Sequence, residues 1–413
     1  MKRVVVTGIG TVNPLGNSLY EAWDAAKAGI SGIKTITRFD VTDSKWKVAG
    51  ELKGFDETVY LTPKEINRLD PFVHYAVAAA FMALKDAELN TGRMQNYVAS
   101  GGVMIGSSRG GISFLEREFQ RKLSLRQSRP VVRTSPYLMP STTISMAPSY
   151  VAQKMGIKGY CLGVSHACSS GTGAIGEAYR LIRAGYKGPV FCGGTEAPLC
   201  RICVEGYGSS GSLSSVMDST ASRPFDRTRD GFVLSEGACI IVLEEYKQAL
   251  KRGVKVYGEI IGYGNTTDAF HQTMPDPQGE ARAMKSAISE AGLKREDIDF
   301  INAHGTATKL GDETETKAIR MSFGKRAYHI PVTSVKSMTG HMLAASGALE
   351  AAFTLLSIEE GIVPPTINLK QRDRACDLDY VTDMRRVTIT NALSNSFGFG
   401  GVNTVLLFRK VKN

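Results

Sequence analysis

The sequence lacks a long uninterrupted hydrophobic run. Its longest mostly apolar stretch, residues 341–361, carries Glu350 near its centre and is rich in small residues. A membrane span needs about 20 predominantly apolar residues with few or no charges, so this segment is predicted to be a buried helix. The first residues are equally unsuited to a signal peptide, because glycines, Asn13 and Pro14 interrupt them. We therefore expect a cytoplasmic protein with no membrane insertion.

Cysteines are few, and their number is odd. The seven thiols stand at positions 161, 168, 192, 200, 203, 239 and 376. Free thiols are expected rather than a disulfide framework, because the chain is large and shows no secretion signal. Cys200 and Cys203 form a C-x-x-C pair, but no second pair and no histidine follows at metal-ligand spacing. No metal site is predicted, and the pair is interpreted as two small residues on a helix face.

The formal charge of +10 favours an acidic or polyanionic partner. Basic residues are scattered, with one modest cluster over residues 120–133. Zinc-finger spacing, an RNA-recognition motif and interleaved aromatic residues are all missing, so nucleic acid is not the expected partner. A solvated charged face remains the alternative for this cluster.

Short β-branched runs alternate with helical patterns along the whole chain of 413 residues. This alternation predicts an α/β protein with two helix-covered sheets, and the length favours two fused halves. Helices are predicted over 74–89, 171–185, 279–292 and 342–360, a junction at 246–256 and a loop at 208–220. Strands are predicted over 3–8, 102–106, 160–165, 189–194, 238–245, 257–264, 298–304, 331–336, 387–397 and 404–409.

Cys168 stands where a predicted strand ends and a helix begins, in the small-residue stretch HACSSGTGAIG at 166–176. A thiol at a helix N-terminus faces the positive end of the helix dipole and unpaired N–H groups. Both favour the thiolate, so a lowered thiol pKa and a nucleophilic role are predicted. An inert buried thiol is the alternative.

The same stretch contains Gly171-x-Gly173-x-x-Gly176, which matches the dinucleotide-binding fingerprint, and Glu196 falls near the distance of a ribose-binding acid. The placement fits poorly, because residues 167–170 separate the strand from the first glycine. The three glycines are therefore expected inside the helix as packing residues. A nicotinamide-binding enzyme is kept as an alternative function.

Two later segments place histidines after predicted strands, where α/β proteins gather their active sites. His304 lies in INAHGTAT at 301–308, and His341 follows Lys336 by five residues in VKSMTGH at 335–341. A glycine- and phenylalanine-rich loop, NSFGFGGVN at 395–403, joins the last two strands.

HACSSGTGAIG, NAHGTAT, VKSMTGH and NSFGFGGVN together resemble the β-ketoacyl-[acyl carrier protein] synthase II family of the thiolase superfamily, and the likeness runs from residue 3 to residue 409. The resemblance implies a thiolase-like five-layer αβαβα fold of two related halves, here 1–250 and 251–413, a homodimer, and no cofactor. It also implies an acyltransferase that performs decarboxylative Claisen condensation in fatty acid biosynthesis. An acyl chain moves from its acyl carrier protein to Cys168, malonyl-carrier protein loses CO2, and the carbanion attacks the thioester, which adds two carbons.

The resemblance assigns the decarboxylation step to two histidines. His304 and His341, as neutral imidazoles, donate hydrogen bonds to the enolate oxygen without a metal. Lys336 orders the histidines and keeps the site cationic, and Glu350 pairs with it.

The same resemblance assigns residues that bind substrate. The amides of Cys168 and Phe399 form the oxyanion hole, and Phe399 is the gate between the acyl tunnel and the malonyl site. Thr306 and Thr308 match positions that hold the phosphopantetheine arm. The acidic carrier protein is expected to dock at Lys64, Arg68, Arg121, Lys122 and Arg126.

Three positions depart from the family's pattern. The family usually has threonine in place of His166, and histidine is common in place of Gly173. Arg109 stands at the neck of the acyl tunnel, where a small or apolar residue is typical. It either restricts the enzyme to short, polar or conjugated acyl groups, or turns outward and leaves the tunnel open. A ketosynthase of a specialised polyketide or aryl-polyene pathway is therefore an alternative function, whereas a chain-length partner commonly lacks the cysteine and is disfavoured.

Overall fold

The structure is a computed structural model that describes residues 1–126 and 132–411. The middle of the basic cluster, residues 127–131, lies outside the described residues. Five strands of the first part of the chain form one half of a central sheet in the order β1-β7-β6-β4-β5. β7 runs antiparallel to β1 and β6, whereas β6, β4 and β5 are parallel. Their bounds are β1 (Val4–Val12), β4 (Gly102–Gly106), β5 (Cys161–Val164), β6 (Val190–Glu196) and β7 (Gly237–Glu245).

The later strands repeat this arrangement in the order β8-β14-β13-β9-β10. If the five strands of each half are numbered in chain order, their order across the sheet is 1-5-4-2-3 in both halves. β14 is again antiparallel to its neighbours, and β13, β9 and β10 are parallel. The bounds are β8 (Gly258–Thr267), β9 (Phe300–Asn302), β10 (Val332–Thr333), β13 (Asn391–Gly398) and β14 (Val402–Arg409). The topology is duplicated although no repeat is visible in the sequence.

The two halves join edge to edge through β1 and β8. Residues 4–6 of β1 pair with residues 258–260 of β8, while the other edge of β1 pairs with β7. The two predicted sheets are joined, because one short antiparallel contact links ten strands into one sheet; β2 (Ile33–Thr35) with β3 (Val48–Gly50), and β11 (Ile362–Val363) with β12 (Arg385–Arg386), form two small sheets apart from it.

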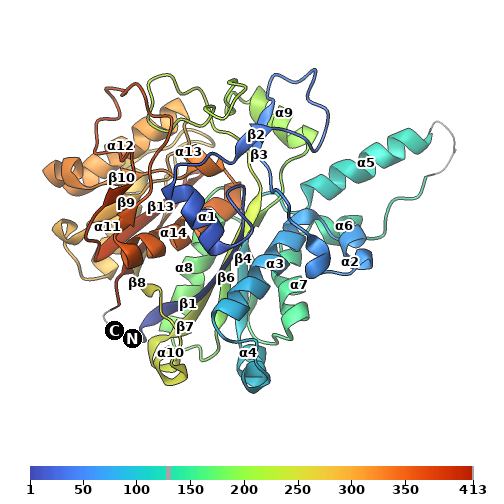
Figure 1. Ribbon diagram of the computed structural model, residues 1–413, viewed down its shortest axis with the longest axis horizontal. Coiled ribbons are helices and arrows are strands. Elements are labelled where there is room, and N and C mark those ends of the chain that lie inside the picture. The colour runs from blue at the N-terminus through green and yellow to red at the C-terminus, as the bar shows by residue number, and fades with distance from the viewer. Residues whose placement is uncertain (127–131, 412–413) are drawn as a thin grey trace.

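Helices form three layers around the two halves of the sheet (Figure 1). α3 (Pro71–Asp86) and α7 (Met146–Met155) cover the outer face of the first half. α11 (Pro277–Glu290) and α12 (Lys309–Phe323) cover the outer face of the second half. α8 (Ser170–Arg183) and α14 (Ser346–Glu360) lie between the halves and contact strands of both. The predicted α/β class and five-layer αβαβα fold are confirmed.

Helices on both faces of the sheet explain why most residues of its strands are buried. In β7, Ile240 and Val242 face the core under α3 and α7, whereas Ile241 and Leu243 face the core around α8 and α14. Successive side chains of a strand point to opposite faces, so a sheet covered on both sides buries all of them. The ten predicted strands are confirmed for this reason, with shifts of a few residues at their ends.

Three predicted segments differ from the structure. The run 331–336 forms only the two residues of β10, and Lys336 begins a short helix, α13 (Lys336–Thr339). The predicted junction holds α10 (Tyr246–Arg252), and the loop predicted at 208–220 begins within the end of α9 (Arg201–Ser209). Within the described ranges, no helix combines the length and hydropathy required to cross a membrane.

Candidate active site

A cavity of about 460 Å³ opens beside the ends of β5, β9 and β13. Strands from both halves of the sheet therefore deliver residues to the same space. The cavity brings together most of the predicted site residues, namely Cys168, His304, Thr306, Thr308, His341 and Phe399.

Cys168 lies on a sharp turn between β5 and α8. Ala167 has a φ of 49°, a left-handed conformation that is unusual for alanine, and α8 begins at Ser170. The predicted position of the thiol at a helix N-terminus is confirmed.

The prediction of a lowered thiol pKa is wrong for this resting site. Burial raises the pKa of Cys168 to about 11, whereas the charges of Lys336 and Arg109 and a hydrogen bond from the Phe399 N–H act in the opposite direction. The thiol is enclosed more deeply than a helix start alone indicates, and an apolar enclosure disfavours the charged thiolate. Cys168 therefore rests as a neutral thiol at neutral pH.

Lys336 links one histidine to a buried acid. Its Nζ pairs with Oε1 of Glu350 and lies 3.4 Å from Nδ1 of His304, and both the lysine and the glutamate are almost fully buried. An ammonium group is only a donor, so Nδ1 of His304 accepts and Nε2 carries the ring proton. The predicted pairing of Lys336 with Glu350 is confirmed.

His341 presents a free ring nitrogen in the same cavity. Its Nδ1 lies 3.1 Å from the hydroxyl of Ser346, which also accepts the N–H of Met342 at 2.9 Å. Among the described residues, the buried Nε2 of His341 has no hydrogen-bond partner. The two imidazoles meet edge to face, with ring centroids 5.4 Å apart.

Both imidazoles are held neutral. Burial is the main cause that lowers the pKa of His304 and of His341 well below 6.5, and the positive charge of Lys336 adds to the effect. The prediction of neutral imidazoles is confirmed. Each neutral ring still carries one N–H that can donate a hydrogen bond.

Phe399 lies in the turn that joins β13 to β14. Gly400 and Gly401 follow it with φ values of 88° and 72°, so this turn requires glycine. The backbone N–H of Phe399 points at Cys168, and its ring is partly exposed at the cavity.

Thr306 and Thr308 stand on either side of a second left-handed residue. Ala307 has a φ of 69°, and the two threonine hydroxyls are hydrogen-bonded to each other at 3.0 Å. Thr308 also caps α12. Both threonines line the cavity.

Two buried glutamates that the sequence reasoning did not assign to the site hold its backbone. Glu315 accepts the N–H groups of His304 and Gly305 at 2.9 and 2.8 Å. Glu196 accepts the N–H groups of Ser108 and Arg109 at 2.7 and 3.0 Å. Because Glu196 is committed to these loops, it is not the ribose-binding acid of a dinucleotide site.

The glycines of the rival fingerprint serve packing. They lie inside α8, and a β-carbon on Gly171 or Gly176 would come within 2.3 Å of the Ala344 carbonyl or 2.2 Å of the Tyr263 ring. The expectation that they are packing residues is confirmed. Gly173 has a different neighbour, because a β-carbon there would lie 2.6 Å from Nδ1 of His166.

Arg109 contacts an aromatic residue that the sequence reasoning missed. Its Nε donates to the hydroxyl of Tyr207 at 2.8 Å, and its guanidinium lies 5.2 Å from the centre of that ring. Tyr207 packs edge to face on Phe232, which packs in the same way on His341. Tyr207 and Cys168 belong to the same apolar cluster.

The five basic residues predicted to dock the carrier protein lie on two helices, α2 (Pro63–Arg68) and α5 (Ile112–Arg126). Lys64 is exposed, whereas the guanidinium of Arg68 lies 4.5 Å from the ring of Tyr137. Arg121 pairs with Glu118. Lys122 donates to Thr134, and Arg126 is exposed at the end of α5.

All seven cysteines are free thiols, as predicted. Cys200 caps α9 and Cys203 lies in its first turn, and both are buried.

The chain matches two models of one protein family. The N-terminal domain model of β-ketoacyl synthase matches residues 1–249, and the C-terminal domain model matches residues 257–370. The chain belongs to the β-ketoacyl synthase family. The predicted family is confirmed, and the nicotinamide-binding alternative has no support.

The similarity to known relatives extends over almost the whole length of this β-ketoacyl synthase. The 3-oxoacyl-[acyl-carrier-protein] synthase 2 of Synechocystis sp. is 46% identical, and that of Staphylococcus aureus is 43% identical, each over 99% of this chain and 98% of the relative. Among solved structures, a β-ketoacyl synthase from Burkholderia phymatum is 35% identical with a TM-score of 0.91. The ishigamide ketosynthase/chain length factor is 33% identical with a TM-score of 0.92. Both similarities cover the whole of each chain.

Proposed function

We propose that this β-ketoacyl synthase is a 3-oxoacyl-[acyl carrier protein] synthase that elongates acyl chains by two carbons in fatty acid biosynthesis. The observation that carries the proposal is one cavity shared by the thiol of Cys168 and the neutral imidazoles of His304 and His341. The 43–46% identity to enzymes named 3-oxoacyl-[acyl-carrier-protein] synthase 2 supports the same reaction.

The first half-reaction transfers the acyl group to Cys168. Its sulfur bonds to the acyl carbon, the bond from that carbon to the carrier's sulfur breaks, and the thiol proton ends on the departing carrier thiol. The N–H of Phe399 points at this sulfur and is therefore placed to meet the oxygen of the tetrahedral intermediate. Lys336 and Arg109 favour the thiolate as the proton leaves.

The second half-reaction forms the new carbon–carbon bond. The malonyl thioester loses CO2, and the bonding electrons move onto its thioester oxygen as an enolate. The Nε2–H of His304 donates to that oxygen. If the hydroxyl of Ser346 donates to Nδ1 of His341, the second imidazole also presents Nε2–H. The enolate carbon then attacks the acyl-Cys168 thioester, and the thiolate leaves.

A direct test is to supply acyl-carrier protein and malonyl-carrier protein and to identify the products by mass spectrometry. The proposal predicts a 3-oxoacyl-carrier protein two carbons longer than the starter, and no product from Cys168→Ala. Failure to elongate any starter, saturated or conjugated, would contradict it.

The acyl carrier protein is proposed to dock over α2 and α5 at Lys64, Arg68, Arg121, Lys122 and Arg126. The net charge of +10 supports electrostatic attraction of an acidic carrier. Reversing Lys64 and Arg68 to glutamate is expected to raise KM for carrier-bound substrate and to leave KM for a small pantetheine thioester nearly unchanged. Equal effects on both substrates would mean that the two residues act through folding.

We also propose a homodimer. β5 is an edge strand of the sheet, and α5 projects from the body of the molecule (Figure 1). Phe119, Leu123 and Met139, on α5 and the following segment, are 57–72% exposed. An unpaired edge and a projecting apolar arm favour contact with a second copy. Sedimentation should give twice 44.6 kDa, and Phe119→Glu with Leu123→Glu should lower that mass.

A second candidate function rests on Arg109 and Tyr207. Their hydrogen-bonded pair adds a guanidinium and a phenol to the apolar cluster around Cys168, so a saturated fatty chain that enters this cluster would meet polar groups. This arrangement favours short, polar or conjugated acyl groups, as in a polyketide or aryl-polyene pathway. The product analysis above distinguishes the two pathways by the starter that is elongated fastest.

The boundaries of the two halves, 1–250 and 251–413, and a cytoplasmic location stay predictions. The repeated strand order supports the division, since the first half of the sheet ends with β7 and the second begins with β8.

A further inference from the structure

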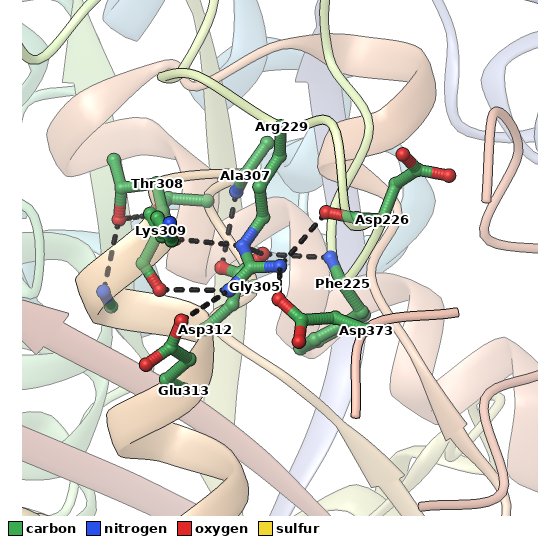
Figure 2. A network of polar contacts seen from close by, with 12 residues as sticks. Phe225, Asp226, Arg229, Gly305, Ala307, Thr308, Lys309, Asp312, Glu313 and Asp373 are labelled. Atoms are coloured by element: carbon green, nitrogen blue, oxygen red, sulfur yellow. Dashed lines mark hydrogen bonds and ion pairs between the residues drawn. The ribbon is translucent and has the colours of Figure 1, made fainter. Parts of the chain in front are cut away.

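Arg229 is a fully buried arginine that directly precedes Asp230 and Gly231, which line the cavity. Its side chain is 0% exposed, and its guanidinium lies between the segment before β7 and the start of α12 (Figure 2). It donates to three backbone carbonyls, those of Asp226, Thr308 and Lys309, at 2.8, 3.2 and 2.9 Å. One side chain thus ties together two segments that are about 80 residues apart.

Three carboxylates neutralise this buried charge. Arg229 lies 3.3 Å from Asp312, 3.3 Å from Glu313 and 2.7 Å from Asp373. A buried guanidinium needs such partners, and its planar fork can satisfy several acceptors in fixed directions. Lysine would supply the charge but not the geometry.

The network ends on the strained turn that carries the two cavity threonines. Asp312 accepts the N–H of Ala307 at 3.2 Å and the N–H of Phe225 at 2.7 Å. The carbonyl of Ala307 accepts the N–H of Gly231 at 3.2 Å. Alanine adopts a left-handed φ only when its surroundings impose it, so these contacts hold the turn.

We propose that Arg229 is a positioning residue that sets the Thr306 and Thr308 hydroxyls for binding the amide-bearing arm of a pantetheine-linked substrate. The inference rests on the proposed function, because it takes a carrier-linked thioester as the substrate. Arg229 does not line the cavity, so it acts only through the turn and the Thr308 and Lys309 carbonyls. A hydroxyl displaced by about 1 Å loses its hydrogen bond to the arm, while the thiol and imidazoles keep their places.

The test compares malonyl-carrier protein, which has the whole arm, with the S-ethyl thioester of malonate, which has none of the arm's amides. Arg229→Lys is expected to raise KM for malonyl-carrier protein by about tenfold or more, with kcat changed by less than about twofold. KM for the short thioester should not change. The matched control is Arg252→Lys at the end of α10, which alters an arginine that is 11% exposed and pairs with Glu244 of β7, and it should leave both KM values unchanged.

A second variant keeps Arg229 and tests the proposal even if Arg229→Lys does not fold. Asp373→Asn removes the carboxylate that makes the shortest contact with Arg229 and leaves Arg229 paired with Asp312 and Glu313. It should raise KM for malonyl-carrier protein in the same direction by about threefold. Equal KM changes on both substrates, or unchanged KM in a folded Arg229→Lys, would overturn the positioning role while condensation by the wild type stands. A wild type that condenses neither substrate would instead refute the proposed function.

Discussion

The imidazole of His166 occupies the space that a side chain at position 173 would need. A β-carbon on Gly173 would lie 2.6 Å from Nδ1 of His166, well inside contact distance. The two departures from the family's usual residues are therefore coupled, since a side chain at 173 would require the imidazole of His166 to move.

This coupling predicts that Gly173→Ala changes the stability in opposite directions in the wild type and in a His166→Thr variant. Gly173→Ala should destabilise the wild type by about 1–3 kcal/mol through overpacking. In a His166→Thr background the clash is gone, and the same change should stabilise by up to about 1 kcal/mol, because alanine favours the helix interior. Chemical denaturation of the four proteins measures both effects. Equal effects in the two backgrounds would show that the two positions are independent.

The pKa of Cys168, about 11, predicts how the thiol reacts. Only the thiolate is alkylated, so iodoacetamide should label Cys168 about tenfold faster for each pH unit, still rising at about pH 9.5. The experiment is done in a Cys161→Ser variant, because Cys161 is exposed and would otherwise be labelled as well. Acyl-carrier protein should protect Cys168. A plateau below about pH 8.5 would mean that the helix N-terminus and the nearby cations outweigh burial.

Removing the charge of Lys336 should narrow the pH range of decarboxylation. In the wild type, both histidines stay neutral well below pH 6.5, so CO2 release from malonyl-carrier protein should remain level through that pH. Lys336→Met with Glu350→Gln removes a charge that lowers both histidine pKa values. As pH falls, the imidazoles of this variant become protonated sooner, so its rate should decline at a higher pH. Superimposable profiles would show that burial alone keeps the histidines neutral.

Arg109 is expected to select against long saturated acyl groups. Arg109→Ile should raise kcat/KM for these long acyl groups, because it leaves room to bury more of their methylene groups. Each buried methylene contributes about 0.8 kcal/mol, which corresponds to about fourfold in kcat/KM. Tyr207→Phe is the matched control, because it keeps the ring and removes the hydroxyl that holds Arg109. If the wild type elongates long saturated chains as fast as short ones, Arg109 turns away from the acyl chain.

Most strands were predictable because both faces of the sheet are covered, which leaves short runs rich in β-branched and other apolar residues in the sequence. Cys168, His304 and His341 were predictable as a set because each follows such a strand or a short turn after one. The burial of the Cys168 thiol was not predictable, because the apolar cluster around it is formed by segments distant in the sequence, including Leu199 and Leu343.

The role of Arg229 was hidden for a related reason. The stretch around it, FDRTRDG at 225–231, has the composition of a solvated loop. Its partners Asp312 and Asp373 lie about 80 and 140 residues further along the chain, and only the tertiary fold brings them together. The unusual residues at 166 and 173 were visible in the sequence, but the contact between them was not.

The central claim is that the thiol and the two imidazoles divide the reaction between them. The most direct measurement follows CO2 release from malonyl-carrier protein and acyl transfer to Cys168 separately in His304→Ala and in His341→Ala. Removing one donor to a developing oxyanion typically costs about 10²–10³ in rate. We predict a loss of that size in CO2 release, with acyl-Cys168 still detected by mass spectrometry. CO2 release and condensation near the wild-type rate in both variants would contradict the account.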